Sequence, residues 1–369
     1  MTKSATKEGT TQYAQRFAGR ASDGHFRETQ RMVLSSLGIG TYLGQPDERT
    51  DASYTAAVVA AVESGINVID TAINYRFQRS ERSVGAALQQ LAVMGFSREE
   101  IVLCTKGGYL TPDGSMPADP NQYFFREYIR QGVFSAKDLA ACSHCITPTF
   151  LKDQLGRSLK NLGVECVDVY YLHNPETQLS EIAKPEFLNR VRNAFEFLES
   201  AVEAGEIRYY GMATWNGFRQ DPRARDSIQL AEIAQIAQEI AGGMHHFRFV
   251  QLPFNLGMPE ALTLGNQMLR ERVRTLAETA GDLDIAVIAS ASLLQGQVAR
   301  NLPGLVAEVF GLENDAERAM QFARSAPGIT TALVGMSRVD HAKANGRLMS
   351  VPPATVEEFS NLFSRGEGA

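Results

Sequence analysis

The sequence of residues 65–75 is Gly65-Ile66-Asn67-Val68-Ile69-Asp70-Thr71-Ala72-Ile73-Asn74-Tyr75, a short apolar run that turns abruptly polar. Two other stretches have the same form: residues 101–106 end in Lys106, and residues 167–173 end in His173. Short β-rich runs that stop at polar residues are typical of buried strands that lead into loops. We therefore expect Asp70, Lys106 and His173 at strand ends, with Tyr75 in the loop after the first strand.

Strand candidates of this kind recur along the chain, at residues 33–41, 67–70, 101–106, 167–173, 207–213, 249–254, 285–289 and 331–334. Segments with helical spacing of apolar residues lie between them, for example at residues 55–64, 81–91 and 149–162. Most successive strand ends are separated by roughly 35–40 residues, close to the ~31 residues per unit of a (β/α)8 barrel. The pattern predicts a single α/β domain, a (β/α)8 TIM barrel over residues 31–369.

Two parts of the chain fall outside this pattern. Residues 1–30 are polar and lack apolar periodicity, which predicts a flexible or loosely docked N-terminal arm. The interval between Lys106 and His173 holds about one extra unit length, which predicts a long loop insertion at about residues 107–147. Loops at the carboxyl mouth of a barrel set substrate choice, so its aromatic residues are expected either to line the substrate pocket or to pack the loop onto the barrel; they are Tyr109, Tyr123, Phe124, Phe125, Tyr128 and Phe134.

The composition excludes several classes of function. The 369 residues are 44% hydrophobic and 21% charged, and the net charge of -6 shows no basic footprint for nucleic acid or an anionic membrane. No apolar run approaches the ~20 residues of a membrane helix, and the N-terminus has no signal pattern, so we expect a cytoplasmic protein. Cys142 and Cys145 have C-x-x-C spacing without a second pair, so reduced thiols, and no metal, are the main expectation. The expected partner is a small molecule, and the oligomeric state is left open.

The four polar residues have a chemistry in common. The carboxyl ends of parallel barrel strands meet at one mouth, which would bring Asp70, Lys106 and His173 together beneath Tyr75. A carbonyl that accepts hydride needs a proton on its oxygen, and a tyrosine phenol can donate one if a nearby ammonium lowers its pKa. Asp70 would hold Lys106, and His173 could donate to the substrate oxygen, orient it, or share the proton. Taken singly, each residue has an ordinary structural role as an alternative, such as a helix cap or core packing.

The residues resemble those of the aldo-keto reductase family from about Leu37 to Leu348. The resemblance rests on residues 37–41, 65–75, 80–81 with Gly85, 168–174, 205–211, 250–255 and 332–338 with Asn345, together with Lys106. It implies a (β/α)8 barrel that binds NADP(H) or NAD(H) at its carboxyl mouth and reduces aldehydes or ketones, or oxidises the corresponding alcohols. It also implies a catalytic tetrad of Asp70, Tyr75, Lys106 and His173, with Tyr75 as the general acid/base.

The same resemblance implies a set of residues that contact the cofactor, from the nicotinamide to the adenosine end: Gly40, Thr41, Asp70, Thr214, Gln251, Ser290, Leu293, Gly335, Ser337, Arg338, His341 and Asn345. Among these, Gln251 matches the glutamine that bonds the nicotinamide carboxamide. Arg338 favours NADP(H), because a guanidinium can bind a 2′-phosphate through two hydrogen bonds, and NAD(H) is the second choice.

The chain departs from the family pattern at two nicotinamide positions. The usual Ser-Asn pair after the fifth strand is Ala213-Thr214, and the usual stacking tyrosine is Ser290. Thr214 can replace part of the lost polar contact, and Trp215 or an insertion residue can supply an aromatic platform. The leading hypothesis is therefore an NADP(H)-dependent carbonyl reductase. The alternatives are a cofactor-holding redox sensor, as in channel β subunits of this fold, and an NAD-dependent sugar or aldose dehydrogenase.

Overall fold

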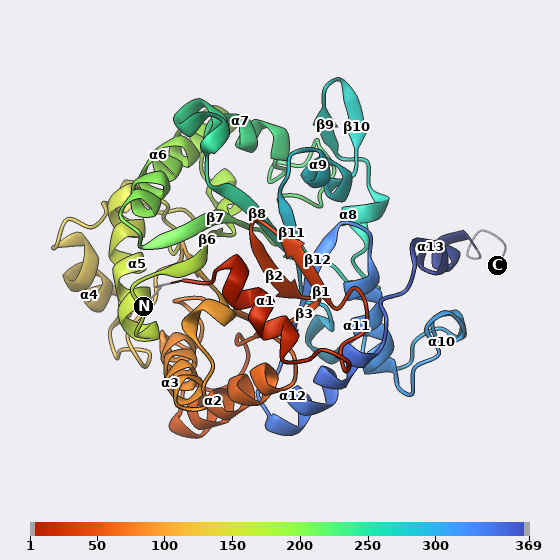
Figure 1. The fold of residues 1–369 in the computed structure, drawn as a ribbon. Helices are drawn as coiled ribbons and strands as arrows, with labels where there is room; N and C mark the ends of the chain where they lie inside the picture. Colours follow the sequence, from red (N-terminus) through yellow and green to blue (C-terminus); the bar gives the residue numbers. More distant parts are fainter. Residues whose placement is uncertain (1–3, 365–369) are drawn as a thin grey trace.

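The structure is a computed structural model that describes residues 4–364. At its centre lies a closed barrel of eight parallel strands (Figure 1). Neighbouring strands follow the order β11-β12-β3-β4-β5-β6-β7-β8, and β8 closes the barrel on β11. The barrel strands are β3 (Leu37–Gly40), β4 (Val68–Asp70), β5 (Val102–Gly107), β6 (Val167–His173), β7 (Ile207–Ala213), β8 (Phe247–Pro253), β11 (Ala286–Ser290) and β12 (Ile329–Gly335). The expected (β/α)8 barrel is confirmed.

Helices surround the barrel (Figure 1). Its outer layer and additions comprise α2 (Glu48–Glu63), α3 (Arg79–Val93), α4 (Pro120–Phe124), α5 (Pro148–Leu162), α6 (Lys184–Glu203), α7 (Leu230–Ala241), α8 (Glu260–Thr263), α9 (Leu276–Asp282), α10 (Gly304–Phe310), α11 (Asp315–Ser325), α12 (Val339–Gly346) and α13 (Val356–Ser364). The helix α5 begins after Thr147 with Pro148 at its first position and ends at Gly163, whose φ of 65° suits glycine.

The strand register brings the site positions to one level of the barrel. Gly335 pairs with Gly40, and Gly40 pairs with Asp70. On the other side of the barrel, His173 pairs with Ala213, and Ala213 pairs with Gln251. Because parallel strands all run in one direction, these residues lie at the same, carboxyl end of the barrel.

Side chains of alternate residues separate two cores. In β6, Val169 and Tyr171 point into the barrel, whereas Tyr170 and Leu172 belong to the larger cluster between the barrel and its helices. This alternation is the ordinary consequence of the period of two in a strand. All four side chains are fully buried, so the strand is apolar on both faces, as expected for a parallel sheet covered by helices.

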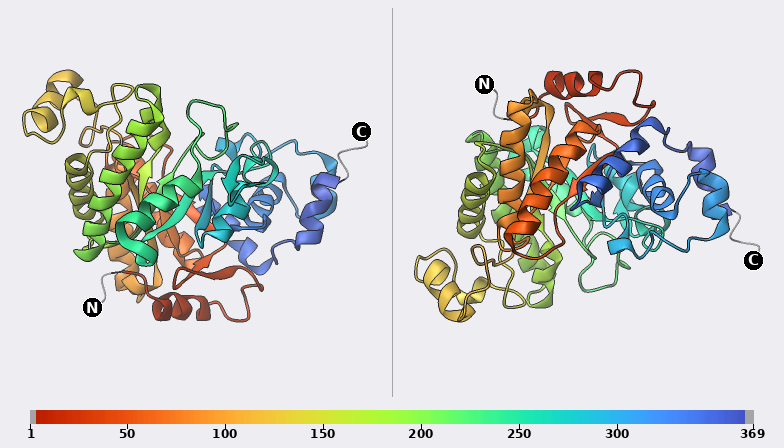
Figure 2. Two further views of the ribbon diagram at one scale, coloured as in Figure 1. Left: turned by 90° about the horizontal axis from the view of Figure 1, so that it is seen from above. Right: turned by 90° about the horizontal axis from the view of Figure 1, so that it is seen from below.

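The N-terminal segment, expected to be a flexible or loosely docked arm over residues 1–30, is folded and docked from residue 4 onward; residues 1–3 lie outside the described residues. The helix α1 (Lys7–Gln15) and the hairpin of β1 (Phe26–Thr29) and β2 (Met32–Ser35) pack at the amino end of the barrel (Figure 2). Asp168 fixes the segment, because its Oδ1 accepts a hydrogen bond from the Ala5 backbone N–H at 2.7 Å, and Tyr13 and Phe17 are buried. The segment is ordered by a few contacts distant in sequence, which apolar periodicity does not reveal.

The insertion after β5 projects from the carboxyl end of the barrel, opposite α1 (Figure 2). Three of its six aromatic residues belong to a small separate core, in which Tyr128 contacts Phe134 of the insertion and Phe150 of α5. Phe125 is 54% exposed, and Tyr109 alone among the expected aromatic residues makes a ring contact with the tetrad in the described structure. Packing of the loop is therefore the role of Phe124, Tyr128 and Phe134.

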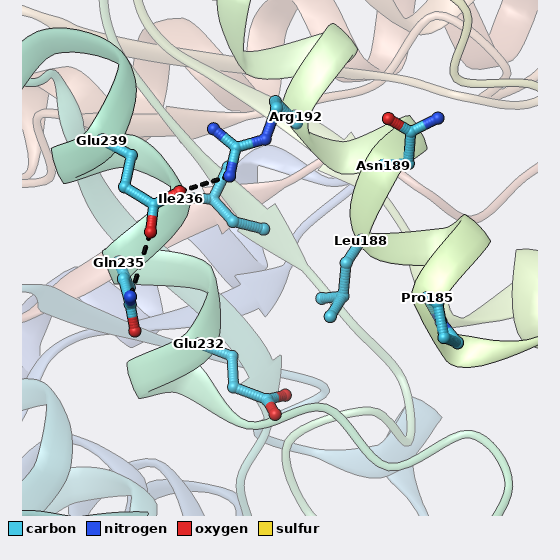
Figure 3. Close-up of a pocket in the computed structure, with 8 residues that line it drawn as sticks. All are labelled: Pro185, Leu188, Asn189, Arg192, Glu232, Gln235, Ile236 and Glu239. Carbon is cyan, nitrogen blue, oxygen red and sulfur yellow. Dashed lines mark hydrogen bonds and ion pairs between the residues drawn. The ribbon is translucent and has the colours of Figure 1, made fainter.

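A groove of about 380 Å³ lies on the outer surface between α6 and α7 (Figure 3). None of the expected site residues lines it, and Arg192 on one wall is paired with Glu239 on the other. Within residues 4–364, no helix is long and apolar enough to cross a membrane, and no cluster of His, Cys, Asp and Glu is arranged to hold a metal ion.

Candidate active site

Lys106 lies at the centre of a polar cluster in the carboxyl mouth of the barrel. Its Nζ lies 2.5 Å from Asp70 Oδ1, 2.9 Å from the Thr71 carbonyl oxygen and 3.3 Å from Tyr75 Oη. An ammonium has three protons, and each of these contacts uses one. The Lys106 side chain is 1% exposed, so its position is fixed by these three acceptors.

The loop that carries Tyr75 has an unusual backbone. Arg76, Phe77 and Gln78 follow in succession with φ of 47°, 57° and 71°, in the left-handed region that side chains disfavour. The buried Arg76 guanidinium compensates for this strain, because it donates to Asp51 Oδ1 at 2.7 Å and to the hydroxyls of Ser80 and Ser83 at 3.0 Å each. The turn directs the chain from β4 back across the mouth and places Tyr75 against Lys106.

Burial and charge act on the tetrad in opposite directions. Burial raises the pKa of Tyr75 above its ordinary value, and Lys106 opposes this by favouring the phenolate. Burial alone would lower the pKa of Lys106, but Asp70 and Tyr75 raise it, so the lysine is charged. The net direction for Tyr75 differs from the lowered pKa that the sequence suggests, because desolvation exceeds the effect of the lysine. Tyr75 is therefore protonated at neutral pH, which its expected role as a proton donor requires.

His173 lies beside Tyr75, with ring centres 5.8 Å apart and the planes at 75°. Burial, Lys106 and His144 all lower the pKa of His173 well below its ordinary value, so its ring is neutral at physiological pH. A neutral imidazole can donate to or orient a substrate oxygen, and it does not compete with the phenol as a source of a proton.

Two aromatic side chains that sequence reasoning missed or left undecided flank this pair. The Tyr42 ring lies 5.0 Å from the Tyr75 ring and is 57% exposed, and the Tyr109 ring lies 5.2 Å from His173. Tyr42 directly follows residue 41, where the sequence predicts a strand to end, so the pattern that indicated Asp70 also indicates Tyr42. These rings give the mouth apolar walls beside Tyr75.

The residues expected at the nicotinamide end lie close to the tetrad. Gln251 donates its side-chain amide to Asp70 Oδ2 at 2.9 Å, and Thr41 donates to the Asp70 carbonyl oxygen at 3.3 Å. Thr214 follows β7 and Ser290 ends β11, at the same end of the barrel. The loop with Thr214 is fixed by Glu176, a residue that sequence reasoning missed, whose Oε1 accepts from the Trp215 N–H at 2.6 Å.

The residues expected at the adenosine end lie on and before α12. Gly335 ends β12, Ser337 follows it, and Arg338 is the N-terminal capping position of α12. The Arg338 guanidinium is 63% exposed and paired with Asp340 at 2.5 Å. Asn345 is partly buried on α12, whereas His341 is exposed. Leu293, after β11, packs on the main core as a partly buried residue.

Several features fit a nicotinamide dinucleotide. The Thr214 hydroxyl is buried and has no hydrogen-bond partner, and the same holds for the Ser292 hydroxyl after β11. A Cβ on Gly335 would meet no atom within 4 Å, and one on Gly40 would meet none closer than 3.8 Å, so the space above both strand ends is open. Unpaired buried hydroxyls are costly unless a ligand satisfies them, which is what a carboxamide or phosphate would do.

The closed eight-stranded barrel with its polar cluster at the carboxyl mouth has the architecture of a (β/α)8-barrel enzyme. A sequence profile of the Aldo/keto reductase family matches residues 36–364, and the chain belongs to this family.

The relatives with known sequences are distant. The NADH-specific methylglyoxal reductase of Escherichia coli K12 is 27% identical over 191 residues, which are 50% of this chain and 50% of that protein. The chain thus spans about half the length of this first curated relative. The Bacillus subtilis oxidoreductase YqkF is 27% identical over 362 residues, which cover 91% of this chain and 94% of that protein.

Solved structures share the fold. An aldo-keto reductase of Bacillus halodurans in its holo form superposes with a TM-score of 0.63 at 20% identity, covering 92% of this chain and 95% of that chain. An aldo/keto reductase of Klebsiella pneumoniae, in complex with NADP and acetate, gives a TM-score of 0.61 at 18% identity, covering 93% and 95%. At these identities the likeness shows the barrel alone.

Proposed function

We propose that this protein is an NADP(H)-dependent oxidoreductase that interconverts aldehydes or ketones and the corresponding alcohols, with Tyr75 as general acid/base. The observation that carries the proposal is the contact of one ammonium, Lys106 Nζ, with both Asp70 Oδ1 and Tyr75 Oη. Membership of the Aldo/keto reductase family supports it. The cofactor, when bound, supplies the hydride; Thr214, Gln251 and the open backbone at Gly40 and Gly335 would hold it.

Side chains of this protein supply the proton that the substrate oxygen takes up during reduction. The substrate oxygen would lie within hydrogen-bond reach of Tyr75 Oη and the neutral His173 ring. As negative charge develops on that oxygen during reduction, Tyr75 donates its proton and becomes a phenolate, and the alcohol product carries the proton away. Lys106 stabilises the phenolate by its charge, and Asp70 keeps Lys106 in place. Oxidation runs the same steps in reverse, with the phenolate as base.

The proposed preference for NADP(H) rests on Arg338 and on neighbours in the fold that were solved with NADP or NADPH. The ion pair between Arg338 and Asp340 opposes this preference, because the carboxylate occupies the guanidinium and repels a phosphate. NAD(H) therefore remains the second cofactor, in line with the NADH-specific relative.

The proposal is tested by titrating the protein with NADPH and NADH by fluorescence and then following turnover on a panel of small aldehydes, ketones and sugars by absorbance. Binding of NADPH with turnover of an aldehyde or ketone supports the reductase. Binding without turnover of any carbonyl or alcohol would favour the redox sensor. Oxidation of sugars with NAD in preference to any reduction would favour the dehydrogenase, whereas failure to bind either cofactor would contradict all three.

A further inference from the structure

A chain of hydrogen bonds connects the insertion after β5 to the backbone of His173. His144, near the end of the insertion, is completely buried, and its Nε2 lies 2.7 Å from the His173 carbonyl oxygen. On the other side of the ring, Nδ1 lies 2.8 Å from the side-chain nitrogen of Gln178. The Gln178 Oε1 in turn accepts from Arg190 Nη1 at 2.6 Å.

The donors and acceptors in this chain determine the tautomer of His144. A carbonyl oxygen can only accept, so Nε2 must carry a proton toward His173. A guanidinium can only donate, so the oxygen of the Gln178 amide faces Arg190 and its nitrogen faces His144. The nitrogen of an amide can only donate, so Nδ1 is an acceptor. His144 is therefore the neutral Nε2–H tautomer, and burial lowers its pKa to about 4.

The surrounding backbone makes the contact rigid. The insertion returns alongside the end of β5, where the Cys145 N–H donates to the Gly108 carbonyl at 2.8 Å. Gly108 leaves no room for a side chain, because a Cβ there would lie 3.0 Å from both His144 Nε2 and the His173 oxygen. The Tyr109 ring packs edge-on against both histidine rings, at 4.9 and 5.2 Å.

We propose that His144 is a positioning residue for catalysis: its Nε2–H holds the His173 carbonyl and thereby sets where the His173 imidazole meets the substrate oxygen. The inference rests on the proposed function, in which His173 contacts that oxygen. His144 itself does not reach the substrate, because both of its ring nitrogens are used by Gln178 and His173. Through His144, the insertion after β5 thus contacts the backbone of His173 directly.

The first test compares two substitutions at the same site. His144→Leu removes the donor at similar volume, and His144→Gln retains an N–H near the position of Nε2. We expect His144→Leu to lower kcat about 10- to 100-fold, since a small misplacement of a reacting group has effects of this order. The NADPH affinity should stay unchanged, and His144→Gln should restore most of the rate. Cys142→Ser, two residues away and exposed, is the matched control and should behave as wild type.

A double-mutant cycle separates positioning from a merely structural role. If His144 acts through His173, His144→Leu should change kcat less than about twofold when His173→Gln is already present. Equal losses in both backgrounds, or full activity of His144→Leu in the wild-type background, would overturn the proposal. If His144→Leu does not fold, Gln178→Met takes its place in the cycle, because it removes the donor that fixes the tautomer and leaves His144 intact.

A measurement independent of turnover distinguishes this proposal from the proposed function. Imidazole ¹⁵N NMR of the whole protein should show His144 as a neutral Nε2–H ring from pH 5.5 to 8, and His173 ring signals that shift in His144→Leu and return in His144→Gln. Protonation of His144 near pH 6, an Nδ1–H tautomer, or His173 signals indifferent to His144 would contradict the positioning role. A wild-type protein that binds NADPH and turns over no carbonyl contradicts the proposed function alone.

Discussion

Gln251 reaches across the barrel from β8 and donates its side-chain amide to Asp70 Oδ2 at 2.9 Å, while Lys106 binds the other oxygen of the same carboxylate. β8 and β4 lie on opposite sides of the strand order, so this bond spans the mouth. The glutamine expected to bond the carboxamide therefore also holds the carboxylate that fixes the lysine.

This double contact predicts that Gln251→Leu affects more than cofactor binding. Hydrogen bonds to charged groups contribute about 1.5–3 kcal/mol, so kcat/KM should fall roughly 10- to 100-fold, with a lower kcat as well as a weaker NADPH affinity. Stopped-flow and fluorescence titration measure the two effects separately. A loss confined to NADPH affinity, with kcat unchanged at saturating cofactor, would show that Asp70 does not depend on Gln251.

Lys106→Met should change the pH dependence of alcohol oxidation. Burial raises the pKa of Tyr75 and Lys106 lowers it, so removal of the lysine raises the pKa further. Alcohol oxidation requires the phenolate form of Tyr75. The rate of oxidation by Lys106→Met should therefore begin to rise at a higher pH than the rate of the wild type does. The measurement is a pH profile of kcat/KM in the oxidative direction. Lys152→Met, an exposed lysine on α5, is the control, and a profile for Lys106→Met that matches it would refute the role of Lys106.

Asp340→Asn should strengthen NADPH binding and leave NADH binding unchanged. The Asp340 carboxylate now pairs with Arg338 through both oxygens, at 2.9 and 2.5 Å, and its removal frees the guanidinium for a 2′-phosphate. Arg338→Ala should have the opposite effect and weaken NADPH about 10-fold, which corresponds to about 1.4 kcal/mol. The measurement is the dissociation constant of each variant for NADPH and for NADH. Equal changes for the two cofactors would show that Arg338 does not bind the 2′-phosphate.

The folded state should lose stability in mild acid because of His25. Burial, together with the charges of Arg324 and Arg27, lowers the pKa of His25 to about 4, whereas an unfolded histidine has a pKa of ~6.5. Between these values the unfolded chain binds the extra proton, so stability falls as pH decreases from about 6.5 toward 4. At pH 5 the loss from this residue is about 2 kcal/mol relative to pH 7.5.

The check is urea unfolding of wild type and His25→Gln at both pH values. Glutamine retains a donor for the Gly65 carbonyl, which His25 Nε2 contacts at 2.9 Å, but it does not titrate. His25→Gln should therefore lose less stability on acidification than the wild type does. Parallel losses in the two proteins would assign the acid sensitivity to other groups, such as His144.

Much of the fold could be predicted because the barrel strands carry a local signal. The bounds of β6 and β7 coincide with the expected residues 167–173 and 207–213, and α5 covers the expected helical segment 149–162. Residues 33–41 form two strands instead of one, because β2 leaves the barrel and pairs with β1 at its amino end. Boundaries of this kind depend on which partner a strand meets, and the sequence pattern does not specify the partner.

The site shows the same division between local and distant information. Strand ends located Asp70, Lys106 and His173, since a barrel brings all such ends to one mouth. No local pattern indicated the bond from His144 to the His173 carbonyl, since the two residues are separated by 29 positions and His144 lies in a loop. The sequence suggested that Lys106 lowers the pKa of Tyr75, but it did not show that Tyr75 is buried, and burial raises this pKa.

Tyr75→Phe tests the central claim most directly, because it removes the proposed proton donor and keeps the aromatic ring that packs against Tyr42. NADPH binding by fluorescence and carbonyl reduction by absorbance should be measured on the same preparation. We expect an NADPH dissociation constant within about twofold of the wild type and a kcat reduced by a factor of at least ~100. Reduction at the wild-type rate by Tyr75→Phe would contradict the assignment of Tyr75 as the general acid.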